Sequence, residues 1–141
     1  MVKINKILVP VDGSKSSAKG FDIAITIAKA TNAKIMALHI IKSSSDFNFQ
    51  ISPEIKTKQL STANKIIDAF KKKAEKQNIE FVGKVTKGSN IGKEIIKFAK
   101  EKKADFIIIG SRGPDPGAEA FFGSVANYVL HKSKIPTTIV K

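Results

Sequence analysis

The sequence predicts an α/β domain built on a parallel sheet. Short apolar runs alternate with longer segments in which apolar residues recur every three or four positions, as in strands followed by amphipathic helices. The runs are apolar at nearly every position, which is typical of strands covered on both faces. The length of 141 residues suits one domain with a sizeable core. We therefore expect a single domain over residues 1–141, with helices on both faces of the sheet.

The N-terminal half begins with a strand over residues 6–12, followed by an Asp-Gly-Ser turn. Helical spacing from Ser16 onward predicts an amphipathic helix. Residues 33–41 form a second apolar run, and the polar segment 43–52 is expected to be a loop. Pro53 suits the first turn of a long helix that continues towards Gln77. The expected buried face of this helix comprises Ile55, Leu60, Ala63, Ile67, Phe70 and Ala74.

The C-terminal half continues the alternation. We expect a strand over residues 80–86 and a helix over 91–103. Residues 104–109 are expected to form the fourth strand. After a segment rich in glycine and proline, residues 124–131 form the last helix and 136–140 the last strand.

The predicted sheet is doubly wound and Rossmann-like. Right-handed crossovers with one reversal of winding place a crevice at the carboxyl ends of the strands, where such sheets bind ligands. Asp12 and Gly110 each stand at the carboxyl end of a predicted strand. If the first and fourth strands are neighbours, both residues face the same crevice.

Composition excludes several classes of protein. The chain has no cysteine, so it has neither a disulfide framework nor a thiolate metal site. No apolar run is long enough to cross a bilayer and no signal peptide is evident, so we expect a soluble, cytoplasmic protein without membrane contact.

The net charge of +13 would attract nucleotides, nucleic acid or anionic membranes. However, the lysines sit at helical spacing, which suits solvent-facing helix surfaces equally well. Arg112 is the only arginine. Since nucleic-acid surfaces more often use arginine and exposed aromatic residues, nucleic-acid binding is disfavoured.

Several phosphate-binding and catalytic patterns are absent from the sequence. No G-x-G-x-x-G follows the first strand, and no G-x-x-x-x-G-K-[ST] occurs. The clustered acids of a response-regulator receiver are missing as well. His39 lies within a strand and His131 near a helix end, where histidines are more often structural than catalytic.

The remaining pattern is Gly110-x-x-Gly113, nine further residues, and then Gly123-Ser124 at the start of a helix. Glycine permits positive φ and close backbone approach. The helix start offers free backbone N–H groups that suit an anion, and Ser124 adds a hydroxyl donor. The alternative is that Ser124 only caps the helix and the glycines only make turns. Spacing alone leaves both interpretations open.

The sequence resembles the ATP-binding branch of the universal stress protein family, which carries the pattern G-x2-G-x9-G-[ST]. Gly110, Gly113, Gly123 and Ser124 match this pattern. The resemblance covers the whole chain. Its segments are ILVPVDGS at 7–14, ALHI at 37–40, ADFIIIGSRG at 104–113, GSV at 123–125 and IPTTIV at 135–140.

The resemblance implies a five-stranded parallel sheet in the order 3-2-1-4-5 and a homodimer. Such dimers commonly pair through the last strand, here Thr137 to Val140. This strand is short, apolar and expected at an edge, which a partner chain would cover.

The resemblance also implies a site for ATP. The base and ribose would lie near Pro10, Val11, Asp12 and Ile40, and the phosphates on Gly110, Gly113, Gly123, Ser124 and Val125. The triphosphate would bring Mg²⁺ or Mn²⁺ and supply most of its ligands. Asp12 would accept from a ribose hydroxyl or help to hold the metal, unless it serves only the turn.

Two features of the glycine segment depart from the plain pattern. Arg112 either pairs with phosphate or points to solvent. Asp115 and Glu119 would repel a triphosphate unless they face outward or meet its metal. These two acids therefore bear on the affinity for ATP and not on the existence of the site.

The expected function is therefore that of an ATP-binding stress-response regulator, with an unknown protein partner. We expect slow or incidental ATP hydrolysis, because no residue is placed as a general base. The alternatives are a dimeric scaffold that binds no nucleotide and a basic nucleic-acid-binding protein.

Overall fold

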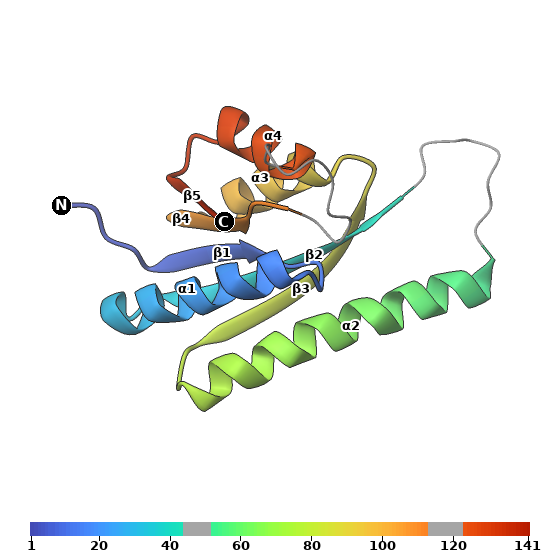
Figure 1. Ribbon diagram of the computed structural model, residues 1–141, viewed down its shortest axis with the longest axis horizontal. Coiled ribbons are helices and arrows are strands. Elements are labelled where there is room, and N and C mark those ends of the chain that lie inside the picture. The colour runs from blue at the N-terminus through green and yellow to red at the C-terminus, as the bar shows by residue number, and fades with distance from the viewer. Residues whose placement is uncertain (44–51, 113–122) are drawn as a thin grey trace.

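The computed structural model describes residues 1–43, 52–112 and 123–141, which alternate between strands and helices (Figure 1). The strands are β1 (Lys6–Pro10), β2 (Lys34–Lys42), β3 (Phe81–Gly88), β4 (Phe106–Gly110) and β5 (Thr137–Val140). The helices are α1 (Lys15–Thr31), α2 (Pro53–Lys76), α3 (Ile91–Glu101) and α4 (Ser124–Lys132). These boundaries agree with the expected ones to within two residues.

The five strands form one sheet in the order β3-β2-β1-β4-β5, and every pair is parallel. This confirms the expected fold class and strand order. β1 pairs with β2 on one edge and with β4 on the other. Because β2 follows β1 in the chain while β4 comes much later, the winding reverses at β1. The crevice predicted by the sequence therefore lies at the carboxyl ends of β1 and β4.

Two layers of helices cover the sheet and bury two apolar clusters. Figure 1 shows α1 and α2 on one face and α3 and α4 on the other. The cluster under α1 and α2 includes Phe21, Ile67 and Phe70. The cluster under α3 and α4 includes Ile95 and Val129. Strand residues alternate between the two clusters, which explains why the strands are apolar at nearly every position.

The long helix α2 extends beyond the sheet, so the N-terminal part of its expected buried face is exposed and that part of the prediction is wrong. Ile55 is 52% exposed and Leu60 is 48% exposed, whereas Ala63, Ile67 and Phe70 are buried as expected. The 24 residues of α2 span about 36 Å at the rise of an α-helix. The 8 residues of β3 span only about 26 Å. The first turns of α2 therefore have no strand beneath them (Figure 1).

None of the helices in the described ranges combines the length and apolar character that a membrane span requires.

Helix α1 packs very closely on β4. A Cβ atom added at Gly110 would lie 2.5 Å from Ser16 Oγ and 2.7 Å from the Ser16 carbonyl carbon. The sequence offers two reasons for a glycine at this position, positive φ and close backbone approach. Among the described glycines, however, only Gly13 has positive φ, at 81°. Gly110 is therefore required here by the close approach of the two backbones.

We expect Gly110→Ala to lower the free energy of unfolding by about 1–3 kcal/mol, because the new methyl group meets the α1 backbone. Gly20→Ala is the matched control in the same contact. The atom nearest to its Cβ across the interface would be Gly110 N, at 3.6 Å. This control should be neutral or should stabilise by up to about 1 kcal/mol, because alanine favours helix. Urea unfolding of both variants checks the prediction, and equal losses would contradict it.

Candidate functional site

A cavity of about 400 Å³, here called the main cavity, opens at the carboxyl ends of β1 and β4. Its volume lies in the range of small-molecule sites. The lining comes from the ends of β1, β2 and β4, from the first turns of α3 and α4, and from Ser17 on α1. The cavity thus occupies the place where the winding of the sheet reverses.

Nine of the ten residues predicted for the site line the main cavity. These are Pro10, Val11, Asp12, Ile40, Gly110, Arg112, Gly123, Ser124 and Val125. They come from four elements that are far apart in the sequence, and the fold brings them together. The tenth, Gly113, lies outside the described residues, as do Asp115 and Glu119.

Further lining residues were not predicted as site residues from the sequence: Ser17, Leu38, His39, Ile91, Ile95, Ile109, Ser111 and Ala126. Most are apolar and were assigned only to strands or to the buried face of a helix. Ser17 and Ser111 are the buried polar residues among the described ones. Burial of a serine has no signature in a single sequence, so neither could be found from its pattern.

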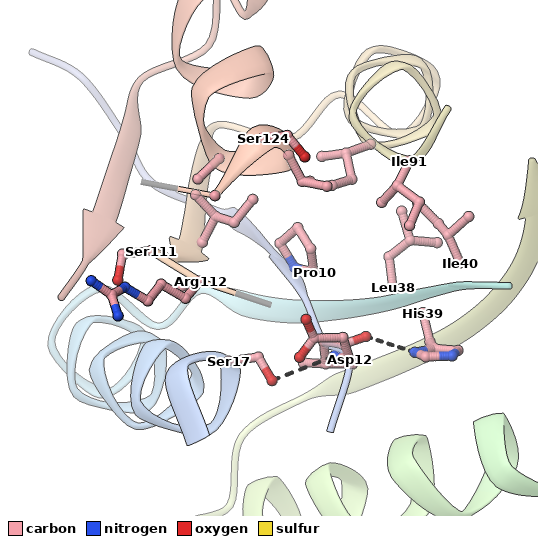
Figure 2. A pocket seen from close by; sticks show the side chains of 17 residues that line it. Pro10, Asp12, Ser17, Leu38, His39, Ile40, Ile91, Ser111, Arg112 and Ser124 are labelled. Atoms are coloured by element: carbon pink, nitrogen blue, oxygen red, sulfur yellow. Dashed lines mark hydrogen bonds between the residues drawn. The ribbon is translucent and has the colours of Figure 1, made fainter. Parts of the chain in front are cut away.

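The turn after β1 is held by its own side chains. Asp12 Oδ1 accepts a hydrogen bond from the Ser14 N–H at 2.9 Å. The Asp12 N–H donates to Ser17 Oγ at 3.4 Å, a long hydrogen bond that Figure 2 draws as a dashed line. The turn role that the sequence left open for Asp12 is therefore real. Since only Oδ1 is used by Ser14, Oδ2 has no such constraint from the turn.

The start of α4 is tied to the end of β4. The Gly123 N–H donates to the Ser111 carbonyl at 2.7 Å, and the Ser111 N–H donates to the Val140 carbonyl at 2.9 Å. The Arg112 N–H donates to Ser16 Oγ at 3.2 Å. These bonds fix the first turn of α4 over the crevice and set its distance from β4.

Among the described residues, no side chain caps the N-terminus of α4. A serine or asparagine side chain caps each of the other three helices: Ser14 for α1, Ser52 for α2 and Asn90 for α3. The N-cap of α4 is Gly123, so the alternative in which Ser124 caps the helix is wrong. The first N–H groups of a helix have no intrahelical acceptor. Those of Ser124 and Val125 stand at the wall of the main cavity.

The main cavity has an apolar end and a polar end. In Figure 2, Leu38, Ile40 and Ile91 lie together at one side, while Ser111 and Arg112 lie at the other. Pro10 stands between them. Such a cavity matches a ligand with a flat apolar part and an anionic part, because apolar walls hold the first and helix N–H groups with an arginine hold the second.

His39 has a structural hydrogen bond. Its Nδ1 lies 2.7 Å from the Val11 carbonyl oxygen and joins the ends of β2 and β1 (Figure 2). His131 is exposed near the end of α4 and does not line the main cavity. Within residues 1–43, 52–112 and 123–141, no three histidine or acidic side chains gather to hold a metal ion.

A family model described as the universal stress protein family matches residues 3–141. The chain is 33% identical to the universal stress protein YxiE of Bacillus subtilis over 147 aligned positions, which cover 97% of this chain and 99% of the relative.

Solved structures have the same fold. That of MJ0577, a protein of Methanocaldococcus jannaschii, superposes with a TM-score of 0.86 at 27% identity and covers 99% of this chain and 97% of its own. A universal stress protein of Arabidopsis thaliana, At3g01520, was solved with AMP bound. It has a TM-score of 0.75 at 20% identity over 97% of this chain and 91% of its own.

We expect Ser14→Ala to lower the free energy of unfolding of the ligand-free protein by about 1 kcal/mol, because the substitution removes the cap of α1. Ser124→Ala should change it by less than about 0.5 kcal/mol, because this exposed hydroxyl caps nothing. Urea unfolding monitored by circular dichroism measures both. A loss at Ser124 as large as that at Ser14 would show that Ser124 stabilises the fold.

Proposed function

Because the chain belongs to the universal stress protein family, we propose that it is a cytoplasmic stress-response regulator that binds ATP and changes its affinity for a protein partner. Doubly wound sheets bind ligands where the winding reverses, and the main cavity lies there. The AMP bound to the Arabidopsis protein supports an adenine nucleotide as the ligand.

The observation that carries this proposal is the N-terminus of α4, which no described side chain caps, beside an apolar recess. Gly123 provides no side chain to satisfy the first N–H groups of the helix, and Ser124 and Val125 face the main cavity. These groups and the helix dipole favour a phosphate. Leu38, Ile40 and Ile91 provide the apolar surface that a purine base requires.

In the proposed arrangement the base lies against Ile40, Pro10 and Val11, with the Ile40 backbone at its edge. The ribose lies near Asp12. The phosphates lie on Gly110, Gly123, Ser124 and Val125, with Arg112 at the outer end and Gly113 completing the pattern. Most of these contacts use the main chain, so the charge of the ligand is met by backbone dipoles and by one arginine.

A divalent metal, Mg²⁺ or Mn²⁺, fits this site if the nucleotide supplies most of its ligands. Asp12 is the one carboxylate among the described residues of the lining, and the turn uses its Oδ1. The protein would then add Oδ2 as a single ligand, or use it for a ribose hydroxyl. Titration of ATP with and without Mg²⁺ separates the two roles, because Asp12→Asn would abolish a metal contribution and leave metal-free binding unchanged.

We propose slow or no hydrolysis of the bound nucleotide. Transfer of a phosphoryl group to water needs a residue that positions the attacking water. Among the described lining residues, Asp12 and His39 are the candidates for this role. In the proposed arrangement Asp12 uses Oδ1 for the turn and Oδ2 for the ribose or the metal, and His39 is hydrogen bonded to Val11. A phosphate-release assay that gave about one turnover per second or more, which is common among enzymes, would contradict this proposal.

We also propose that two chains pair through β5. Within the described residues, β5 is hydrogen bonded to β4 along one edge and has no neighbouring strand along its other edge. The Ile107 N–H donates to the Pro136 carbonyl, whereas the register partner of Ile107 is Thr137. In a parallel strand, successive residues direct their backbone N–H and C=O groups to opposite edges. The N–H and C=O of Thr137 therefore point away from β4, towards the open edge.

Thr137→Pro should convert the dimer into a monomer without unfolding it, because proline removes an outward N–H and is tolerated on edge strands. Light scattering after size-exclusion chromatography should give about twice the 15.3 kDa chain mass for the wild type and one chain mass for the variant. A monomeric wild type, or a dimeric variant that remains folded, would refute pairing through β5.

Gly123→Val should abolish the increase in melting temperature that Mg-ATP produces in the wild type. Bound ligand stabilises the folded state, and the new side chain occupies the helix start where phosphate would sit. The backbone at Gly123 has φ −62° and ψ 161°, which valine also adopts, so the variant should still fold. Ser61→Val, at an exposed position of α2, is the matched control and should keep the full shift.

A full shift in Gly123→Val would show that the phosphates bind elsewhere. No shift in the wild type with ATP, ADP or AMP would favour the scaffold that binds no nucleotide. Tight DNA or RNA binding with a steep dependence on salt would favour the nucleic-acid-binding alternative.

A further inference from the structure

A second cavity of about 290 Å³, here called the side cavity, lies next to the main cavity. It is lined by Lys42, residues 89–92, Ser124, Val125 and Tyr128. Ile91, Ser124 and Val125 line both cavities. The wall between the cavities therefore consists of the first residue of α3 and the first two residues of α4.

Ile91 is the largest side chain of this wall, and its backbone is fixed on both sides. Before it, Asn90 caps α3, with Oδ1 accepting from the Lys93 N–H at 3.0 Å. After it, a Cβ atom at Gly92 would lie 2.6 Å from Tyr128 Cδ1, so the Tyr128 ring rests directly on the α3 backbone. With both neighbours held, the first turn of α3 cannot shift to move Ile91 out of the wall without breaking one of these contacts.

The two cavities differ in chemistry. On the main-cavity side, Ile91 lies with Leu38 and Ile40 at the apolar end (Figure 2). On the other side, Lys42, Ser89 and Tyr128 give the side cavity a more polar lining. Ile91 is half-buried and also packs on the apolar cluster beneath α3 and α4. One side chain thus separates an apolar recess from a more polar one.

We infer that Ile91 determines which nucleotides the main cavity accepts, because it closes the side cavity to groups attached to the base. This inference deepens the proposed function and rests on it. An unsubstituted adenine fits the apolar end, whereas a base that carries a bulky substituent meets the Ile91 side chain. Shortening Ile91 joins the two cavities, and the substituent then enters the side cavity.

The test compares ATP with ATP analogues that carry a benzyl or phenyl group at N6, C2 or C8 of the adenine. Dissociation constants are measured by calorimetry for the wild type, Ile91→Val and Ile91→Ala. We expect at least one analogue to bind Ile91→Ala with a dissociation constant about tenfold or more below its value for the wild type. One or two methylene-sized groups in a pocket have effects of this size. Ile91→Val should be intermediate. ATP itself should bind Ile91→Ala no more tightly than it binds the wild type, because the variant loses part of the apolar surface against the base.

Ile79→Ala is the matched control, because Ile79 is also half-buried and packs on the other apolar cluster, away from both cavities. It should leave the discrimination between ATP and the analogues unchanged. If no analogue gains affinity in Ile91→Ala or Ile91→Val while ATP still binds, Ile91 is not the selecting residue and the proposed function stands. If the wild type binds no ATP, the proposed function fails and this inference fails with it.

Discussion

β1 is hydrogen bonded along both edges, to β2 on one side and to β4 on the other. The chain leaves β1 towards β2 and returns much later to β4, so the helices that follow lie on opposite faces of the sheet. No helix can cross over the carboxyl end of β1 in this arrangement. Asp12, Gly110 and the start of α4 meet around the space that remains. Every feature of the main cavity depends on this pairing.

The close approach of α1 to β4 refines that geometry. At Gly110 and Ser16 the backbones come so near that a side chain on the strand would meet the helix. The same contact lets Ser16 Oγ accept from the Arg112 N–H, so the chain beyond β4 leaves the sheet in a defined direction. Gly123 then bonds to Ser111 and begins α4. A structural requirement at Gly110 thus coexists with the proposed ligand role of the same segment.

The succession of strands and helices along the chain could be predicted from the sequence, because apolar runs and helical spacing are local patterns. The order of the strands in the sheet and the residues near the base and ribose came from the resemblance to the universal stress protein family. The glycine-serine spacing and the position of Asp12 pointed to the crevice without it. Other features depend on distances between elements. The exposure of Ile55 and Leu60 follows from α2 being longer than β3, which no periodicity reveals. The side cavity arises where Tyr128 of α4 meets Gly92 of α3, two residues 36 positions apart with no shared motif.

The overhang of α2 gives one helix two different local stabilities. From Ala63 to Ala74 its apolar stripe is buried against the sheet, so amide hydrogens there exchange with solvent only when the whole layer opens. The first turns, near Ile55, have lost that support and can unwind on their own at a small cost in free energy. Protection against hydrogen exchange should therefore rise along α2 from its N-terminus to its C-terminal half, within a helix that is continuous in its backbone.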